Sequence, residues 1–294
     1  MKLNHNPATL TVQDLLTLFQ LSERNLYKFT NRPKHYYRSF SIPKRTGGFR
    51  TIEAPTPLLK KIQHQILENF LEPHPVSRFA KAYKKGATLK EMARFHVNQQ
   101  MVVRIDLTDF FGSLKEASVF RFFRQQGYSE TVTVILTKLV TYRGGLPQGA
   151  PTSPTLSNIL MRKIDERIAR YCSEKKIRYT RYADDLVFSG DFSIKRLLAK
   201  LHNILAPQRL QINNKKTRVM RRHSTQMVTG LVVNDRLGIA RNTRRKLRQE
   251  LYYSEKFGIK SHTEAIGESR SPEIYIQVLE GRKHYIETYH PQPK

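Results

Sequence analysis

The chain has 294 residues, of which 39% are hydrophobic, and it contains 15 Phe and 14 Tyr. This content is enough for a sizeable core and excludes a disordered basic protein. Lys and Arg number 52 against 24 Asp and Glu, and the resulting formal net charge of +28 favours a polyanionic partner. Nucleic acid is a better candidate than an anionic membrane, because no amphipathic lysine-rich helix stands apart from the rest.

The sequence predicts neither a membrane span nor an export signal. Its uncharged apolar runs are shorter than the roughly 18 to 20 residues that a membrane-spanning helix needs. The N-terminal stretch MKLNHNPATLTVQDLL lacks the apolar segment and cleavage site of a signal peptide. The single cysteine, Cys172, excludes an internal disulfide and a cysteine-based zinc site. We therefore expect a cytoplasmic protein.

The first hundred residues contain two predicted regions. Residues 1–35 form a helical N-terminal extension, in which Thr11 caps VQDLLTLFQ and a second short helix covers SERNLYKF. Residues 36–100 begin with two β-rich runs on either side of Gly47 and Gly48, in YYRSFSIPKRTGGFRTIEAP, which predicts a hairpin. A helix is then predicted in LLKKIQHQILENFL, because its apolar residues recur at helical spacing.

Residues 101–234 alternate short apolar strands with helical stretches. The predicted strands are MVVRIDL, IRYTRY, LVFSG and QMVTGLVV, and the helices lie in LKEASVFRFFRQQ, SETVTVILTKLV and SPTLSNILMRKIDERIARYC. This order predicts an α+β fold with helices on one face of a small antiparallel sheet. Residues 235–294 are basic and mainly helical, beginning with RNTRRKLRQELYY, and are expected to form a separate terminal lobe.

Two acidic sites lie at strand ends. Asp184 and Asp185 fall between the β-rich runs of IRYTRYADDLVFSG, which predicts that a hairpin tip exposes both carboxylates. Asp is common in turns, so this pair is not specific by itself. In VVRIDLTDFFGS, however, Asp106 ends an apolar strand and Asp109 follows it. An acid inside an apolar strand is costly to bury unless it is paired or binds a metal.

These acids together indicate phosphoryl transfer. Two divalent ions about 3.5 to 4 Å apart, bridged by carboxylates from different strands, activate an attacking hydroxyl and stabilise a leaving pyrophosphate. Asp106, Asp184 and Asp185 supply such a set, and the predicted metal site also includes Leu107, beside Asp106. Because carboxylates are hard oxygen ligands, the expected metals are two Mg²⁺ ions. Salt bridges to the many arginines are the structural alternative.

Three motifs resemble those of reverse transcriptases. The stretch Tyr182–Asp185 resembles their YxDD motif, Asp106 with Phe110 and Phe111 resembles their first catalytic motif, and Leu146–Pro154 resembles their LPQGxxxSP loop. The resemblance covers about residues 36–235 and keeps the family's order. It implies an RNA-directed DNA polymerase with a right-hand fold: fingers at 36–100, a palm with interleaved fingers elements at 101–234, and a basic helical thumb at 235–294.

The resemblance also assigns roles around the acids. It implies that the nucleotide-binding residues for deoxynucleoside triphosphates are Lys44, Arg50, Asp109, Phe110, Phe111 and Gln148. A glycine turn flanked by Lys and Arg is itself a fair polyphosphate clamp, although lysines in turns are often simply solvated. Lys216, or alternatively Lys215, is placed to protonate pyrophosphate. Val228, Thr229, Gly230 and Leu231 resemble the primer-grip hairpin.

Within this family the chain is most similar to retron enzymes. It is short, it lacks an appended endonuclease or maturase region, and it carries VTG at 228–230. Retron enzymes show an Asn-Ala-x-x-His element, whereas Met92–His96 matches it only at Ala and His. The role of His96 therefore stays open, and a packed structural histidine is the alternative.

A retron enzyme copies part of its own structured noncoding RNA, starting from a 2′-hydroxyl, and leaves a branched RNA–DNA product. The resemblance implies this RNA and its DNA product as partners, together with an effector protein in anti-phage defence. We expect the RNA to contact Arg244, Arg245, Lys246 and Tyr285, because arginines bind phosphates and tyrosines stack on unpaired bases. The alternative is a generic thumb that grips any duplex.

Two other functions remain open. One is a polymerase of the same fold that is intron-encoded, diversity-generating or template-independent. The other is a non-catalytic nucleic-acid scaffold, which would have no reason to keep the three acids together with Gln148.

Overall fold

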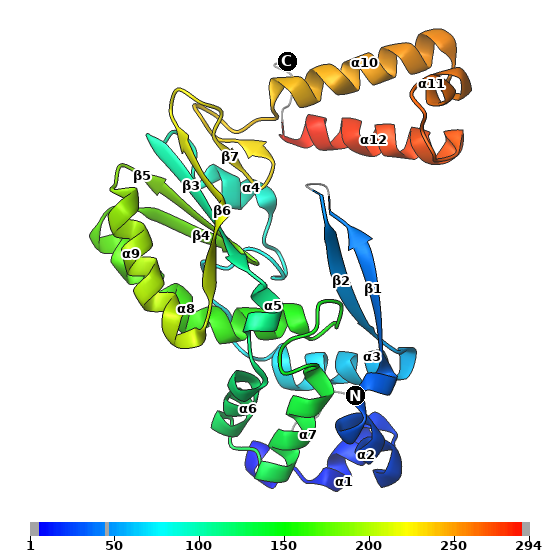
Figure 1. Ribbon diagram of the computed structural model, residues 1–294, viewed down its shortest axis with the longest axis vertical. Helices are drawn as coiled ribbons and strands as arrows, with labels where there is room; N and C mark the ends of the chain where they lie inside the picture. Colours follow the sequence, from blue (N-terminus) through cyan, green and yellow to red (C-terminus); the bar gives the residue numbers. More distant parts are fainter. Residues whose placement is uncertain (1–5, 45–46, 290–294) are drawn as a thin grey trace. The chain divides into compact units, whose positions relative to one another are not determined.

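The computed structural model describes residues 6–44 and 47–289 (Figure 1). The ends of the predicted N-terminal extension and thumb, residues 1–5 and 290–294, and the hairpin residues 45–46 lie outside this range. The chain divides into two compact units. The first comprises the residues up to Gly86, Ile105–Leu186 and Phe192–Thr217, and the second comprises Ala87–Arg104, Val187–Asp191 and the residues from Arg218 onward. Over the described range, no helix is both long and apolar enough to cross a bilayer.

The first unit begins with the two predicted helices, α1 (Val12–Phe19) and α2 (Glu23–Asn31). Helix α1 starts where it does because Thr11 and Asp14 form a capping box: the Thr11 hydroxyl accepts from the Asp14 amide at 3.2 Å, and the Asp14 carboxylate accepts from the Thr11 amide at 2.8 Å. Short 3₁₀ turns precede α1 at Pro7–Thr9 and follow α2 at Pro33–Tyr36.

The predicted hairpin is present as β1 (Tyr37–Pro43) and β2 (Phe49–Pro55), which pair antiparallel with Tyr37 opposite Pro55 and Pro43 opposite Phe49. Helix α3 (Pro57–Ile66) follows and continues into a π-helical turn at Leu67–Leu71. The buried residues of α3 include Leu59, Ile62 and Ile66, so its apolar stripe is the one that the sequence predicts.

A four-stranded sheet has the order β4-β5-β3-β6, formed by Arg178–Tyr182, Asp185–Gly190, Met101–Thr108 and Gln211–Arg221. Strands β3, β5 and β6 each contain residues of both units. Most of β3 is buried, and its side chains alternate between the two faces of the sheet, which explains its nearly continuous apolar run.

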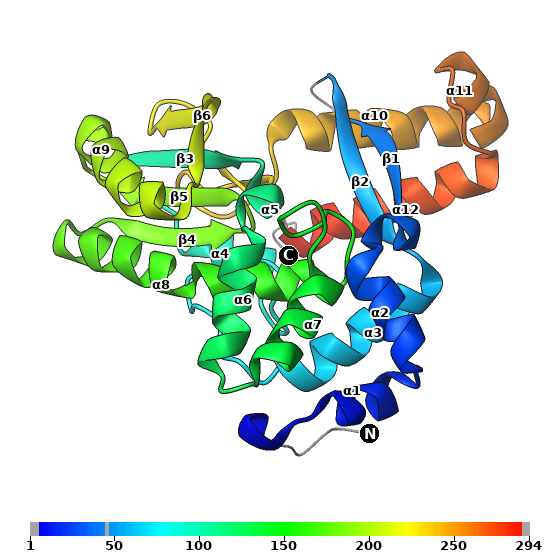
Figure 2. The same ribbon diagram turned by 60° about the horizontal axis from the view of Figure 1, so that its bottom comes forward.

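The remaining helices of the first unit are labelled in Figure 2. They are α5 (Phe110–Ser113), α6 (Glu116–Gln125), α7 (Glu130–Val140), α8 (Ser153–Glu174) and α9 (Ile194–Leu205), with a 3₁₀ turn at Ala206–Gln208. Helix α8 packs against β4 and against α9, and α6 packs against α7. The long α8 therefore runs beside the strand that leads to Asp184.

The second unit contains α4 (Leu89–Arg94), the short strands β7 (Met227–Val228) and β8 (Leu231–Val232), and three helices. The stretch QMVTGLVV, expected as a strand, is a tight hairpin, because Thr229 and Gly230 have φ values of 49° and 87° and reverse the chain. The helices are α10 (Arg241–Phe257), α11 (Ile259–Ala265) and α12 (Pro272–Tyr289). Their core is Leu247, Tyr275 and Leu279.

Candidate functional site

The turn between β4 and β5 carries the predicted acids. Ala183 has φ 54°, a left-handed conformation that allows the two-residue reversal into Asp184. The Leu107 amide donates to the Asp184 carbonyl at 3.0 Å, so the turn is joined to β3 directly beside Asp106. Asp185 begins β5. Hydrogen bonding between strands thus brings together acids that lie 78 residues apart in the chain.

The side chains at this edge interact electrostatically. Asp106 is 8% exposed, and the Lys216 ammonium donates to both of its carboxylate oxygens, at 3.0 and 3.1 Å. Burial raises the pKa of Asp184, and the negative charge of Asp106 raises it further, whereas Lys216 and Arg50 oppose this shift. The charges of Asp106, Lys216 and Arg50 thus all act on Asp184. Of the two candidate lysines, it is Lys216 that pairs with Asp106.

The donor chemistry fits a hard divalent cation. Carboxylate oxygens are the ligands that Mg²⁺ prefers, and a cation would relieve the repulsion that raises the pKa of Asp184. Across residues 6–44 and 47–289, however, no three His, Cys, Asp or Glu side chains are gathered closely enough to hold a metal by themselves. The Lys216 ammonium supplies the positive charge at Asp106 in this arrangement.

An aromatic surface follows Asp106 along the chain. Asp109 has φ 43° and turns the chain into α5, so that Phe110 and Phe111 open this short helix. Phe110 is 5% exposed and belongs to the core, whereas Phe111 is half-buried, and their rings lie 5.4 Å apart. The Tyr83 ring lies 6.4 Å from that of Phe111. Sequence analysis did not select Tyr83.

The loop that carries Gln148 packs against strand β2. The Glu53 amide donates to the Gln148 carbonyl at 2.8 Å. A Cβ at Gly149, which has φ 138°, would lie 2.9 Å from the Glu53 carbonyl oxygen, so only glycine fits this approach. Arg50 lies on β2 opposite Ile42, and Lys44 lies just beyond the end of β1. The hairpin and the loop are thus joined at Glu53. The positive charge of Arg50 lowers the pKa of Asp184.

In the second unit, the β7–β8 turn lies next to helix α12. Val228 and Leu231 are fully buried, which fixes the turn at Thr229 and Gly230. A Cβ at Gly230 would lie 3.7 Å from the Tyr285 hydroxyl. The predicted primer-grip turn and the predicted RNA-binding Tyr285 are therefore neighbours.

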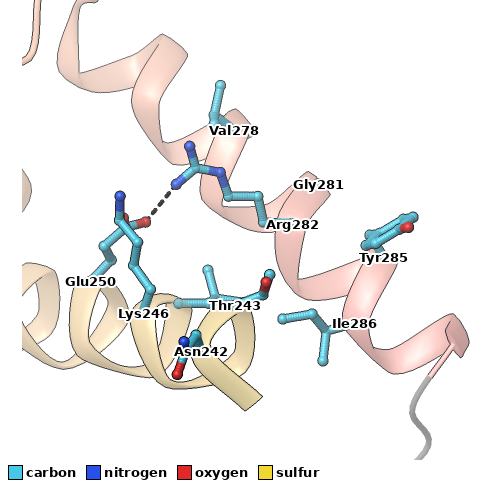
Figure 3. Close-up of a pocket in the computed structure, with 10 residues that line it drawn as sticks. Asn242, Thr243, Lys246, Glu250, Val278, Gly281, Arg282, Tyr285 and Ile286 are labelled. Carbon is cyan, nitrogen blue, oxygen red and sulfur yellow. Dashed lines mark hydrogen bonds and ion pairs between the residues drawn. The ribbon is translucent and has the colours of Figure 1, made fainter. Parts of the chain in front are cut away.

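A cavity of about 540 Å³ lies between α10 and α12 (Figure 3). Tyr285, Ile286 and Gly281 line it on α12, and Lys246 lines it on α10. At one end Arg282 forms an ion pair with Glu250 at 2.6 Å, and Lys246 lies 3.9 Å from the same carboxylate. Arg245 is exposed, whereas Arg244 donates to the Ile239 carbonyl at 3.3 Å.

His96 is fully buried, and its Nδ1 lies 2.7 Å from the hydroxyl of Ser189 on β5. Met92, which replaces the asparagine of the retron element, is also fully buried. This buried environment favours a structural role for His96, which links the segment after α4 to β5.

A sequence profile described as reverse transcriptase (RNA-dependent DNA polymerase) matches residues 42–246. The chain is 33% identical over 292 residues to the retron Mx65 reverse transcriptase of Myxococcus xanthus, covering 92% of this chain and 65% of that protein. It is 33% identical over 252 residues to the retron Ec86 reverse transcriptase of Escherichia coli, covering 84% of this chain and 79% of that protein. The chain thus spans slightly less than two thirds of the first relative.

Among solved structures, the chain is similar to telomerase from Candida albicans, determined in complex with a fragment of telomeric RNA. The TM-score is 0.51 at 12% identity, and the match covers 69% of this chain and 45% of that chain. At this identity the likeness concerns the fold alone.

Proposed function

The chain belongs to the reverse transcriptases, and within them to the retron enzymes, and on that premise we propose that it is an RNA-directed DNA polymerase acting at the edge where Asp106 meets Asp184. The right-hand polymerase fold expected from the sequence is confirmed by the family match and by the likeness to telomerase. The observation that carries the proposal is the hydrogen bond from the Leu107 amide to the Asp184 carbonyl, which joins the acidic turn to β3 next to Asp106, the carboxylate that pairs with Lys216.

We propose Asp106, Asp184 and Asp185 as ligands for two Mg²⁺ ions, with Leu107 at the same edge. When bound, such ions supply the charge that activates a primer 3′-hydroxyl and stabilises leaving pyrophosphate. Lys216 lies against Asp106, at the same edge. An ammonium in that place can donate a proton to pyrophosphate.

The remaining residues of the first unit would hold the nucleotide. Arg50 presents a guanidinium that suits phosphate oxygens, and Lys44 lies nearby on the same hairpin. Asp109, Phe110, Phe111 and Gln148 complete the proposed nucleotide-binding set. The domain limits at residues 35, 100 and 234 remain part of the proposal.

Phe111 is proposed to select deoxyribonucleotides over ribonucleotides. Its half-buried ring comes shortly after Asp106 in the sequence and would collide with the 2′-hydroxyl of a ribonucleotide. We expect Phe111→Val to raise ribonucleotide incorporation, relative to deoxyribonucleotide, by about 10- to 200-fold. Phe110→Ala should instead lower the free energy of unfolding by about 3 to 5 kcal/mol, because Phe110 is buried. Single-nucleotide extension with each sugar measures the first effect, and denaturant unfolding measures the second. Unchanged sugar preference in folded Phe111→Val would place the selection elsewhere.

The template partner is proposed to be a structured noncoding RNA. DNA synthesis would start from an internal 2′-hydroxyl of this RNA and leave a branched RNA–DNA product. Similarity to two named retron enzymes supports this proposal, as does the basic face of α10. We further propose that the enzyme works in the cytoplasm with an effector protein in anti-phage defence. An intron-type, diversity-generating or template-independent polymerase, and a non-catalytic scaffold, are the competing functions.

The cavity between α10 and α12 supports RNA recognition by this lobe. Gly281 lies inside α12, where glycine costs about 0.5 to 1 kcal/mol relative to alanine. A Cβ built on Gly281 meets no atom within 4 Å, so packing within the described chain does not explain this glycine. The open space is bordered by Tyr285 and by the cationic Lys246 and Arg282 (Figure 3). An unpaired nucleotide has the matching chemistry, with an apolar base and an anionic phosphate.

Filling this space is expected to separate RNA binding from folding. Gly281→Leu should weaken binding of the cognate RNA by about 10-fold, because a lost base-stacking contact is worth roughly 1 to 3 kcal/mol. Its thermal stability should stay equal or rise, since a better helix former replaces glycine. Gly281→Ala is the matched control, with a stabilised helix and a cavity left mostly open. Normal RNA affinity in Gly281→Leu would remove the cavity from the interface.

Two measurements test the proposed function as a whole. Primer extension on an RNA template with Mg²⁺, compared with a gel-shift assay, separates a polymerase from a scaffold. Sequencing the nucleic acid that copurifies with the protein separates retron enzymes from other polymerases of this fold. DNA joined to RNA through a 2′ linkage is expected, and DNA without that linkage would contradict the retron assignment.

A further inference from the structure

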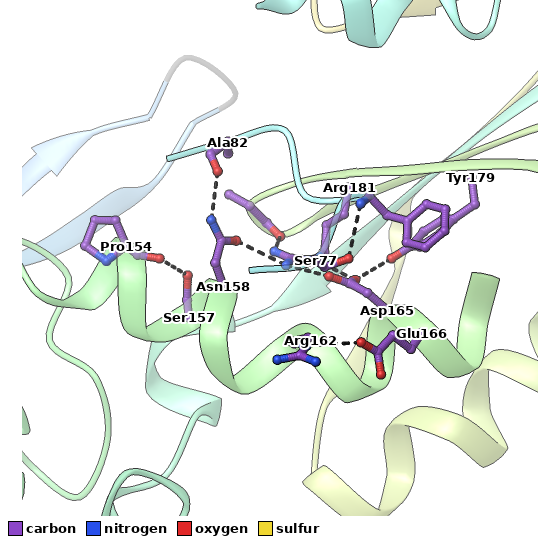
Figure 4. Close-up of polar contacts among 12 residues, drawn as sticks. Ser77, Ala82, Pro154, Ser157, Asn158, Arg162, Asp165, Glu166, Tyr179 and Arg181 are labelled. Atoms are coloured by element: carbon purple, nitrogen blue, oxygen red, sulfur yellow. Dashed lines mark hydrogen bonds and ion pairs between the residues drawn. The ribbon is translucent and has the colours of Figure 1, made fainter. Parts of the chain in front are cut away.

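A buried ion pair joins strand β4 to helix α8, close in sequence to the β4–β5 turn (Figure 4). Arg181, on β4, and Asp165, on α8, are both fully buried, and the guanidinium donates to the two carboxylate oxygens, each at 2.8 Å. The Tyr179 hydroxyl donates to the same carboxylate at 2.7 Å. Burying two charges costs much of what their attraction returns, so such a pair is weak evidence for stability alone. Its geometry indicates that it fixes a conformation.

The Arg181 guanidinium has two further partners. One amino group donates to the Ala183 carbonyl at 3.1 Å, which holds the residue of the turn that adopts a left-handed φ. The other donates to the Asn158 side-chain oxygen at 3.1 Å. Asn158 in turn donates to the Ala82 carbonyl at 2.8 Å (Figure 4). One buried cation therefore fixes both the turn and the segment that ends at Ala82.

The backbone of Arg181 holds the same segment. Its amide donates to the Phe79 carbonyl at 2.8 Å, and its carbonyl accepts from the Lys81 amide at 2.8 Å. Ala80 accordingly forms a parallel bridge with Arg181. Tyr83 directly follows this hydrogen-bonded segment in the chain.

Tyr83 has φ 57°, a conformation that is strained for a bulky residue, whereas glycine adopts it freely. Its side chain is nevertheless half-exposed, so burial in the core does not repay this cost. Its ring lies 6.4 Å from Phe111, and the charges of Asp184 and Arg50 both act on its hydroxyl. A strained, exposed aromatic side chain thus lies beside the proposed nucleotide-binding residues.

We propose that Tyr83 contacts the incoming nucleotide opposite Phe111. Arg181 and Asn158 are then positioning residues, whose buried network fixes the position of both Tyr83 and the β4–β5 turn. This inference rests on the proposed polymerase function. An aromatic face packs on a base or sugar without regard to sequence, so Tyr83 would strengthen binding of every deoxynucleotide. The strain at Tyr83 is then the cost of presenting its ring.

Variants of Tyr83 test the contact. Tyr83→Ala is expected to raise the KM for deoxynucleotides by about 10-fold and to change kcat by less than about 3-fold, because binding and not chemistry is lost. Tyr83→Gly should show the same KM with restored or increased thermal stability, since it removes the strain. Tyr83→Phe should retain the KM of the unaltered chain. Tyr27→Ala, which truncates an exposed tyrosine on α2, is the matched control and should change neither constant.

Asn158 tests the positioning. Asn158→Ala should also raise the KM, and the double variant with Tyr83→Ala should be no worse than Tyr83→Ala alone, because both act on one contact. Additive losses would show a general packing defect and overturn the positioning role. An unchanged KM in Tyr83→Ala would overturn the nucleotide contact.

Nucleotide affinity measured on a primer terminated without a 3′-hydroxyl separates this inference from the proposed function. In this complex no turnover occurs, so a lower affinity of Tyr83→Ala supports the contact whatever the rate of chemistry. If the unaltered chain binds the nucleotide but never extends a primer, the polymerase proposal fails and not the contact.

Discussion

Replacing Asp184, Asp185 or Asp106 with Asn is expected to abolish DNA synthesis while RNA binding and the fold stay nearly unchanged. The amide keeps the shape of the carboxylate and removes the charge that would hold a divalent ion. Metal assistance contributes several kcal/mol to phosphoryl transfer, so each variant should lose about 1,000-fold or more in rate. Single-turnover extension at saturating Mg²⁺ measures the loss, and a gel-shift assay with thermal unfolding checks binding and fold.

The three positions differ in what the substitution leaves behind. Asp106→Asn also removes the carboxylate that Lys216 contacts, so this variant loses an ion pair as well as a metal ligand. Asp184→Asn removes a carboxylate whose pKa is raised mainly by burial. Because removing this charge also removes a desolvation cost, the fold of this variant should be the least affected of the three. Asp191→Asn, which neutralises an exposed acid at the end of β5, is the control and should remain active. Near-normal incorporation in any of the three variants would remove that residue from the metal site.

Local sequence predicts this edge because each part of it follows from short-range rules. The nearly continuous apolar run of β3 places Asp106 near the end of a buried strand, and turn chemistry places Asp184 at a hairpin tip. The order of the motifs then identifies the family, which supplies the pairing of the two strands. Side-chain direction lies beyond these rules, so the sequence predicts three carboxylates but not the Lys216 ammonium on Asp106.

The network behind the turn could not be predicted in the same way. Arg181 and Asp165 lie 16 residues apart on a strand and a helix, and either charge in the sequence alone indicates a solvated surface. One signal was available: Asp165 lies on the apolar stripe of α8 with Met161, Ile168 and Cys172, where a charge needs a buried partner. Nothing local indicates Tyr83, whose neighbours Lys81 and Lys84 suggest an ordinary basic loop.

The basic lobe gives the second large expected effect. Arg245→Ala with Lys246→Ala should reduce initiation on the cognate noncoding RNA by about 10- to 100-fold, with far less effect on extension of a pre-annealed DNA primer on an unrelated template. Both side chains are exposed, so their loss should not disturb α10. Arg244 is left in place because it donates to the Ile239 carbonyl and supports the start of the helix. Lys195→Ala with Arg196→Ala, an exposed basic pair on α9, is the matched control.

Salt dependence then tells phosphate contacts from base contacts. Each lost phosphate contact should lower the slope of log affinity against log salt by about 0.7 to 0.9, so the double variant should lose about 1.4 to 1.8. Tyr285→Ala should weaken cognate binding and leave the slope unchanged, because stacking on a base releases no counterions. Specific recognition requires both signatures on the cognate RNA and neither on the unrelated template. Equal losses on both substrates would mean that the lobe grips any duplex, and the source of RNA specificity would then lie outside α10 and α12.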